Sequence, residues 1–266
     1  MNRDTLIEKL KADVAQGNLA IIAGTGVSVS ACGNQEIEGC KVATWTGLLE
    51  HGVKHCRDIG VADNADLDLL NAQIASNKTH FLIAVAEDVS RRMKAQAPGV
   101  FFGWLKNTIG KLKIKERAVL DALDALPGVL ATLNYDNLLE DATGRRAVTW
   151  QKPDEVQDVL TRNVTDAVLH LHGWYREPDS VVLGLTSYLA VKDNPHANAV
   201  LKLFTMDRTV LFVGCGDTVL DPNLTQLIEW GKEALKDVAP RTICSVASLS
   251  SSTFRGSSRW LLGCNR

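Results

Sequence analysis

The stretch LAIIAGTGVS, residues 19–28, decides the fold class of this chain. It begins with consecutive apolar residues, a pattern typical of a strand that is buried on both faces, as in a parallel sheet. Two glycines follow, Gly24 and Gly26, and a helix can begin between Gly26 and Ser28. A buried strand, a glycine turn and a helix in this order predict the first unit of an α/β protein.

Outward from this stretch, apolar runs of the same kind recur along the chain. They predict further strands at residues 129–136, 147–151, 168–173, 209–216 and 242–248. Segments with helical spacing include residues 6–15, before the first strand, and residues 223–235. Strands that alternate with helices predict an α/β fold, a Rossmann-like parallel sheet flanked by helices.

One long segment carries helical patterns only. It begins at Trp45 and predicts a helical module, about residues 45–126, inserted into a domain that spans residues 1–240. Residues 241–266 differ from the rest: after the last predicted strand they are serine-rich and basic, with no acidic residue. We expect this atypical tail, from about Ser248, to be disordered or to mark the edge of a truncation.

The composition excludes several classes of protein. Of the 266 residues, 45% are hydrophobic and 23% charged, which is ordinary for a globular protein and excludes wholesale disorder. A net charge of −2 gives no basic surplus, so direct nucleic-acid binding is not expected. No apolar run approaches the roughly 20 residues of a membrane span, so no membrane association is expected. The 6 cysteines include no C-x-x-C pair, a pattern typical of reduced thiols in the cytoplasm.

The glycine turn GTGVS is a candidate phosphate-binding loop. Gly24 and Gly26 would let the backbone approach a pyrophosphate, while Thr25, Ser28 and the helix start would supply hydrogen-bond donors. The full G-x-G-x-x-G fingerprint is absent because Val29 occupies its last position, which disfavours a typical NAD dehydrogenase. A plain glycine turn is an equally good interpretation of this motif taken alone.

Polar residues end two of the other predicted strands. In LNYDN, Asn134 and Asp136 could orient ribose hydroxyls or a carboxamide; alternatively, they cap the next helix. In HLHG, His170 and His172 alternate along a strand and point the same way. His172, before Gly173, suits a general base, whereas His170 is expected to be packed or hydrogen-bonded inside the sheet. No third ligand is suitably spaced, so no metal is predicted.

A second glycine turn, GCGDTVLDPNL, follows the apolar run that begins at Thr209. It places Gly214 and Gly216 where strand gives way to loop, and Asp217 could cap the following helix or reach an adenosine ribose. Ligands of open α/β sheets bind beyond the carboxyl ends of the strands. The sequence therefore predicts that the functional site lies where these motifs meet.

Taken together and in this order, GTGVS, LNYD, HLHG and FVGCGDTVLDPNL resemble the sirtuin-like NAD-binding family, over residues 19–235. The resemblance is greater to the bacterial, zinc-free antiphage defence branch, which hydrolyses NAD, than to protein deacetylases. It implies a Rossmann-like sheet with a smaller inserted module, with NAD+ as the substrate and no metal.

The resemblance also implies a role for each motif residue. Asn134 and His172 would be catalytic, the first by orienting the ribose on the nicotinamide side and the second by engaging its hydroxyls. Asp136 would support the nicotinamide end. The remaining residues would bind the pyrophosphate and the adenosine: Gly24, Thr25, Gly26 and Ser28 for the former, and Gly214, Gly216 and Asp217 for the latter.

Departures from the deacetylase pattern favour water as the acceptor of ADP-ribose. The paired C-x-x-C zinc ligands of deacetylases are missing, and SVSACGNQEIEG stands where they usually carry Pro-Asp-Phe-Arg. We therefore predict an NAD+ glycohydrolase that makes nicotinamide and ADP-ribose. The alternatives are a zinc-free protein deacylase or ADP-ribosyltransferase, and a non-catalytic module that senses NAD or ADP-ribose.

An NAD hydrolase of this branch must stay silent until infection is sensed. The resemblance therefore implies an effector of abortive infection that is regulated by a partner or by assembly. We expect a cytoplasmic protein that forms a homo-oligomer, binds a separate sensor, or does both. Sensors of the branch include STAND-type ATPases, HerA-type translocases and Argonaute-like proteins.

Overall fold

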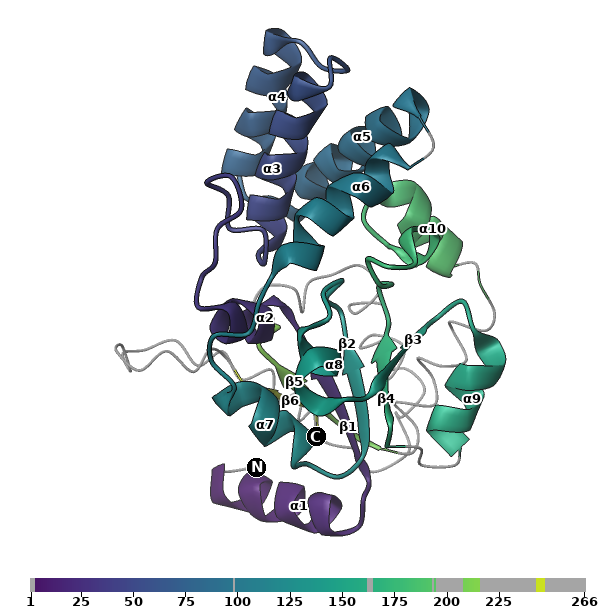
Figure 1. The fold of residues 1–266 in the computed structure, drawn as a ribbon. Helices are drawn as coiled ribbons and strands as arrows, with labels where there is room; N and C mark the ends of the chain where they lie inside the picture. Colours follow the sequence, from purple (N-terminus) through teal and green to yellow (C-terminus); the bar gives the residue numbers. More distant parts are fainter. Residues whose placement is uncertain are drawn as a thin grey trace, which may run out of the picture.

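The protein is built around a six-stranded sheet in which all neighbouring strands are parallel (Figure 1). The computed structural model describes residues 3–97, 99–161, 165–192, 194, 208–215 and 243–246. The strand order is β3-β4-β2-β1-β5-β6. Their bounds are Leu19–Ala23 (β1), Val129–Thr132 (β2), Arg146–Thr149 (β3), Ala167–His170 (β4), Thr209–Val213 (β5) and Ile243–Val246 (β6). The predicted Rossmann-like parallel sheet is confirmed.

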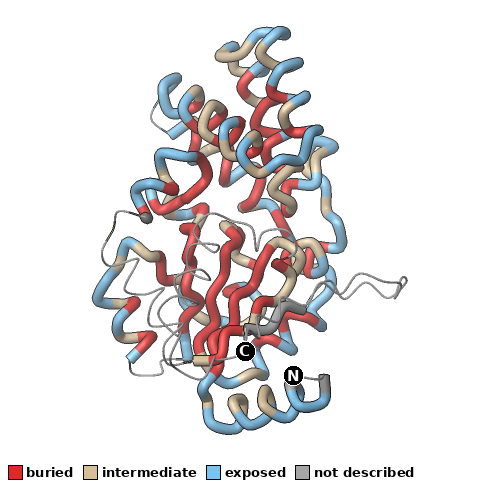
Figure 2. Tube along the Cα trace, turned by 180° about the vertical axis from the view of Figure 1, so that it is seen from behind, coloured by how far each residue is buried: buried red, intermediate tan, exposed pale blue. Residues whose placement is uncertain are grey.

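Both faces of the sheet are covered, which explains why β1 is apolar at every position. Ile21 belongs to a large hydrophobic core on one face, and Ile22 belongs to a second core on the other. Figure 2 shows the central strands largely buried and the outer sides of the helices exposed. The first face packs against α2 (Thr25–Cys32), α7 (Ala118–Asp124) and α8 (Leu138–Thr143), and the second packs against α9 (Pro153–Thr161).

Four helices stand beyond the end of the sheet (Figure 1) and form the helical module. They are α3 (Trp45–Asp58), α4 (Asn64–Ala75), α5 (Thr79–Gln96) and α6 (Val100–Asn107), followed by the 3-10 turn η1 (Ile109–Lys111). The buried Trp104 indole donates to His51 Nδ1 at 3.1 Å and joins α6 to α3. By contrast α7 lies along the sheet, beside α2 and α8. The domain boundaries at residues 126 and 240 remain predictions.

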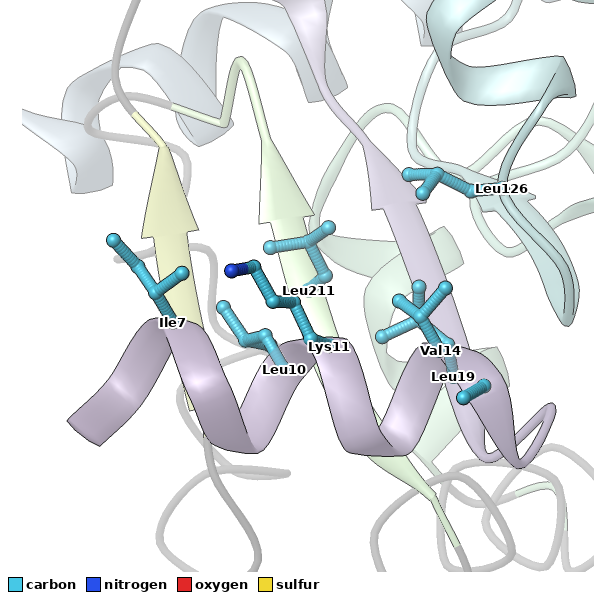
Figure 3. A pocket seen from close by; sticks show the side chains of 8 residues that line it. Ile7, Leu10, Lys11, Val14, Leu19, Leu126 and Leu211 are labelled. Atoms are coloured by element: carbon cyan, nitrogen blue, oxygen red, sulfur yellow. The ribbon is translucent and has the colours of Figure 1, made fainter. Parts of the chain in front are cut away.

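The first helix, α1 (Arg3–Ala15), lies at the end of the sheet opposite the module (Figure 1). Between α1 and the sheet is a cavity of about 430 Å³, seen in Figure 3. Apart from Lys11, its lining is apolar and includes Leu19, the first residue of β1. The cavity thus adjoins the beginning of β1, away from the carboxyl ends where the sequence predicts chemistry.

Several predicted elements can be compared directly. The strands predicted at 129–136 and 168–173 end early, at Thr132 and His170, so that their last polar residues lie in loops. The helix α10 (Leu185–Lys192), which follows the 3-10 turn η2 (Pro178–Ser180), was not predicted. The closing strand exists as β6, whereas the predicted helix at 223–235 and the tail beyond residue 246 lie outside the described residues. Within the described part of the chain, no helix has the length and apolarity of a membrane span.

Candidate functional site

The motifs predicted from sequence come together at one edge of the sheet. Ala23 of β1 pairs with Thr132 of β2 and with Val213 of β5, and Thr132 pairs with His170 of β4. Because these pairings are parallel, the chain leaves all four strands at the same edge, on the side of the helical module (Figure 1). This edge is where an open α/β sheet binds its ligands.

Asn134 follows β2 and is only 6% exposed. Its amide nitrogen donates to the carbonyl oxygen of Gly24 at 2.8 Å and to Ser28 Oγ at 2.7 Å. A carbonyl oxygen can only accept, so these contacts fix which end of the amide is nitrogen. Asn134 Oδ1 is left buried without a hydrogen-bond partner among the described residues. A buried acceptor in this state is costly unless a ligand supplies the donor.

Asp136 completes this network. Since Ser28 Oγ accepts from Asn134, its hydroxyl hydrogen is directed to Asp136 Oδ2, 2.6 Å away. The other carboxylate oxygen accepts from the N–H of Leu138 at 3.0 Å, at the start of α8. Burial raises the pKa of Asp136, while the hydrogen bonds from Ser28 and Leu138 oppose that rise. Asp136 thus accepts from the first N–H of α8, whose N-cap is Asn137, whereas Asn134 reaches across to the start of α2.

Thr132 and His170, the last residues of β2 and β4, pair with each other. Asn134 and His172 each lie two residues beyond them, in the loops that follow the two strands. His172 is 5% exposed, and its carbonyl oxygen accepts from the N–H of Val182 at 2.8 Å. The ring of Tyr188, from α10, lies edge-on to the imidazole with centroids 5.9 Å apart. The imidazole is therefore beside the predicted ribose site and covered by α10.

The helical module holds α10 in this place. Glu87 of α5 accepts hydrogen bonds from the Thr186 backbone N–H at 3.0 Å and from its hydroxyl at 2.7 Å, at the start of α10. Gly184 allows the close approach, because a Cβ there would lie 2.5 Å from Glu87 Cα. The module thus touches the site through α10.

The two glycine turns pack directly on each other. The Gly26 N–H donates to the carbonyl oxygen of Gly214 at 2.8 Å. A Cβ on Gly24 would lie 2.6 Å from Cys215 Cα, and one on Gly26 would lie 2.8 Å from the Gly214 oxygen. Gly214 itself has a left-handed φ of +67°. The close contact between the turns that follow β1 and β5 therefore requires glycine at these positions.

Burial makes Cys215 chemically inert in the folded protein. It raises the pKa of this thiol to about 12, so almost no thiolate exists at neutral pH. We expect Cys215 to resist iodoacetamide at pH 8 in the native protein and to react at once after unfolding in guanidinium. Peptide mapping by mass spectrometry measures this, with the partly exposed Cys40 as the internal comparison. Rapid native labelling of Cys215 would show that the contact between the glycine turns opens readily.

His170 is 1% exposed, with hydrogen bonds to the backbone of Asn134 and to Glu140, so its predicted packing inside the sheet is confirmed. Glu140 was missed, because LLED is an ordinary helical pattern. A signal for it did exist: a histidine in an otherwise apolar buried strand needs a polar partner.

The predicted site residues fall into three groups. Ser28, Asn134 and Asp136 share one hydrogen-bond network, and Gly24, Gly26 and Gly214 pack beside it. Thr25 is the first residue of α2, and His172 lies in the loop two residues beyond β4. Gly216 and Asp217 lie outside the described residues. Across the described ranges, no three His, Cys, Asp or Glu side chains form a group that could hold a metal ion.

Comparison with known proteins identifies the family of the chain. Residues 128–260, half of the chain, match the SIR2-like domain family. The chain belongs to this family, and the resemblance seen in the sequence is confirmed. The match begins just before β2 and includes Asn134, Asp136, His172 and Gly214.

The chain is also similar to two curated proteins. Defense-associated sirtuin 2 from Bacillus subtilis is 29% identical over 115 residues, which cover 42% of this chain and 11% of that protein. NAD(+) hydrolase ThsA from Enterococcus faecium is 26% identical over 235 residues, which cover 86% of this chain and 43% of that protein. The chain thus spans less than half the length of either relative.

Proposed function

We propose that this chain is an NAD+ hydrolase that releases nicotinamide and ADP-ribose. The observation that carries the proposal is Asn134 Oδ1, a buried acceptor with a fixed orientation and no partner among the described residues. A ribose hydroxyl is a donor of the right kind for it. The name of the relative from Enterococcus faecium and the SIR2-like match support NAD as the ligand that brings this ribose.

The proposed reaction breaks the bond between the ribose anomeric carbon and the nicotinamide nitrogen. The electron pair of that bond goes to the nitrogen, which removes the pyridinium charge, and positive charge develops on the ribose. The oxygen of water then bonds to the anomeric carbon, and the proton that it loses passes to the solvent. Asn134 Oδ1 would fix the ribose through a hydroxyl, and His172 would accept from another hydroxyl, so that both place partial negative charge beside the cation.

The glycine turn at Gly24 and Gly26 would hold the pyrophosphate, with the amino end of α2 behind it. Its donors are fewer than the sequence suggested. The Gly26 N–H already donates to Gly214, and the Ser28 hydroxyl already donates to Asp136. In this proposal Ser28 orients Asn134, and Thr25 is the hydroxyl that remains for phosphate.

We further propose that the hydrolase acts in antiphage defence, as an effector of abortive infection in the cytoplasm. The printed name of the relative from Bacillus subtilis supports a defence role. Control by a sensor partner, by homo-oligomerisation or by both belongs to the same proposal. The contact of the module with α10, whose Tyr188 covers His172, offers a route for such control.

The direct test is nicotinamide release from NAD+ by the purified chain, followed by chromatography, with and without an acyl-lysine peptide. We expect release in the absence of peptide. Strict dependence on peptide would instead support the deacylase alternative. The sensing-module alternative would be supported if calorimetry detects NAD+ binding but the NAD+ stays intact, at all protein concentrations and with candidate partners added.

A further inference from the structure

Behind the proposed site lies a buried pair of titratable side chains, Glu140 and His170. His170 Nε2 lies 2.6 Å from Glu140 Oε1, and both side chains are almost completely inaccessible. The other ring nitrogen, Nδ1, lies 3.1 Å from the backbone oxygen of Asn134. The imidazole therefore joins α8 to the residue whose side chain faces the proposed ribose.

The chemistry of these contacts requires an extra proton. A backbone carbonyl oxygen can only accept, so Nδ1 must carry a hydrogen. A neutral imidazole has one hydrogen, which would leave Nε2 with a lone pair facing the carboxylate of Glu140 at 2.6 Å. The contact is attractive when Nε2 is also protonated. His170 is then an imidazolium that donates on both sides, in a charge-assisted pair with Glu140.

We propose that Glu140 and charged His170 are positioning residues that hold the backbone of Asn134 in place for NAD. The role rests on the proposed function, since it acts on NAD through Asn134. Hydrogen bonds to Gly24 and Ser28 fix the Asn134 side-chain amide, and the backbone N–H of Asn134 donates to Thr132 Oγ1 at 3.0 Å, which leaves the backbone oxygen of Asn134 to His170. The imidazolium fixes that oxygen in place.

The surroundings of His170 favour the charged form on balance. Burial lowers the pKa of His170. Glu140 raises it through its charge and its hydrogen bond, and Asp136 raises it through its charge, so that the net shift is upward. Glu140 comes from α8 and Asp136 from the loop before it, while the Trp174 ring lies 6.0 Å away. The cationic Arg176 lies over the Trp174 ring and interacts by charge with Glu140, the carboxylate of the pair.

The upward shift gives a defined dependence on pH. The folded pKa of His170 lies above the value of about 6.5 for an unfolded histidine. The stabilising effect of the pair is therefore complete below about pH 6.5, and it is lost as pH rises through the folded pKa. Above that pH, neutral His170 keeps its Nδ1–H toward the Asn134 oxygen but presents a lone pair to Glu140, so the contact that anchors the imidazole to α8 is lost.

Comparing the wild-type protein with two variants of Glu140 distinguishes a positioning role from simple structural support. In Glu140→Gln, the new amide can donate to Nε2 of a neutral His170, whose Nδ1–H still donates to Asn134. This variant keeps both hydrogen bonds without the extra proton. Glu140→Ala removes the hydrogen-bond partner of Nε2.

We expect the wild-type kcat for NAD+ cleavage to fall as pH rises through the folded pKa of His170. The Gln variant should keep a near-wild-type kcat without that fall, and the Ala variant should lose about 10-fold in kcat. Glu155→Gln, at an exposed pair with Arg146, is the matched control and should change nothing.

Nuclear magnetic resonance of ¹⁵N-histidine-labelled protein makes the test independent of turnover. We expect both His170 nitrogens to be protonated at pH 7 in the wild type and only Nδ1 in Glu140→Gln, with the signals assigned from His170→Gln. A neutral wild-type His170 at pH 7, or cleavage by Glu140→Ala with wild-type kcat and pH profile, would overturn the proposal. Intact NAD+ in every assay would refute the proposed hydrolase and, with it, the role toward NAD, while a doubly protonated His170 would still establish the charged pair.

Discussion

Replacing Asn134 by alanine is expected to lower the rate of NAD+ cleavage by about 100-fold or more, the scale at which one preorganised polar contact acts in a transition state. The variant removes Oδ1, the buried acceptor without a partner among the described residues. It also releases Gly24 and Ser28 from their hydrogen bonds to the amide. Initial rates of nicotinamide release over a range of NAD+ concentrations measure the loss.

The interpretation of this variant depends on its remaining folded. Circular dichroism and the midpoint of thermal unfolding should place it near the wild type, because the alanine keeps the backbone contact with His170. Asn71→Ala, an exposed asparagine on α4, is the matched control and should keep full activity. Wild-type cleavage by a folded Asn134→Ala protein would refute the assignment of Asn134 as a catalytic residue.

Gly214→Ala is expected to produce the largest loss of stability, roughly 3 kcal/mol in the free energy of unfolding. A left-handed φ costs a residue with a Cβ about 1–2 kcal/mol. The new Cβ would also lie 2.6 Å from the backbone nitrogen of Val27, and strain of that kind adds about 1–3 kcal/mol. For a domain of this size, the midpoint of thermal unfolding should fall by about 8 °C.

Gly17→Ala separates the two causes. Gly17 has almost the same φ, +68°, but nothing lies within 4 Å of its Cβ position. We expect this variant to lose only about 1 kcal/mol, the conformational part of the cost. Equal losses in the two variants would show that the close contact between the glycine turns contributes nothing to stability.

The sheet could be predicted from sequence because its central strands are buried on both faces and are largely apolar. β1 and β5 illustrate this, since neither shows the polar alternation of a half-exposed strand. The glycine turns could also be found, since a parallel sheet places its ligands where strands end. α10 was not predicted, because its place depends on Glu87, about a hundred residues earlier in the chain.

The detailed roles within the site depend on contacts that local patterns do not encode. Ser28 appears in the sequence as a free donor, yet the fold commits its hydroxyl to Asp136, 108 residues away. Glu140 lies in an unremarkable helical pattern and becomes important only because β4 brings His170 beside it. Which hydrogens remain for a ligand is decided by tertiary packing, and sequence alone does not give it.

The strand order also bears on how the chain folds during synthesis. β1 lies between β2 and β5, but β2 leaves the ribosome more than a hundred residues later, and β5 later still. The helices of the module are synthesised between β1 and β2 and pack on one another. Because local contacts form faster than distant ones, these helices can pack before the sheet forms. Until β2 is complete, β1 exposes two apolar faces and two unpaired edges. A nascent chain at this stage is a natural client for chaperones and the point at which slowed translation would favour aggregation.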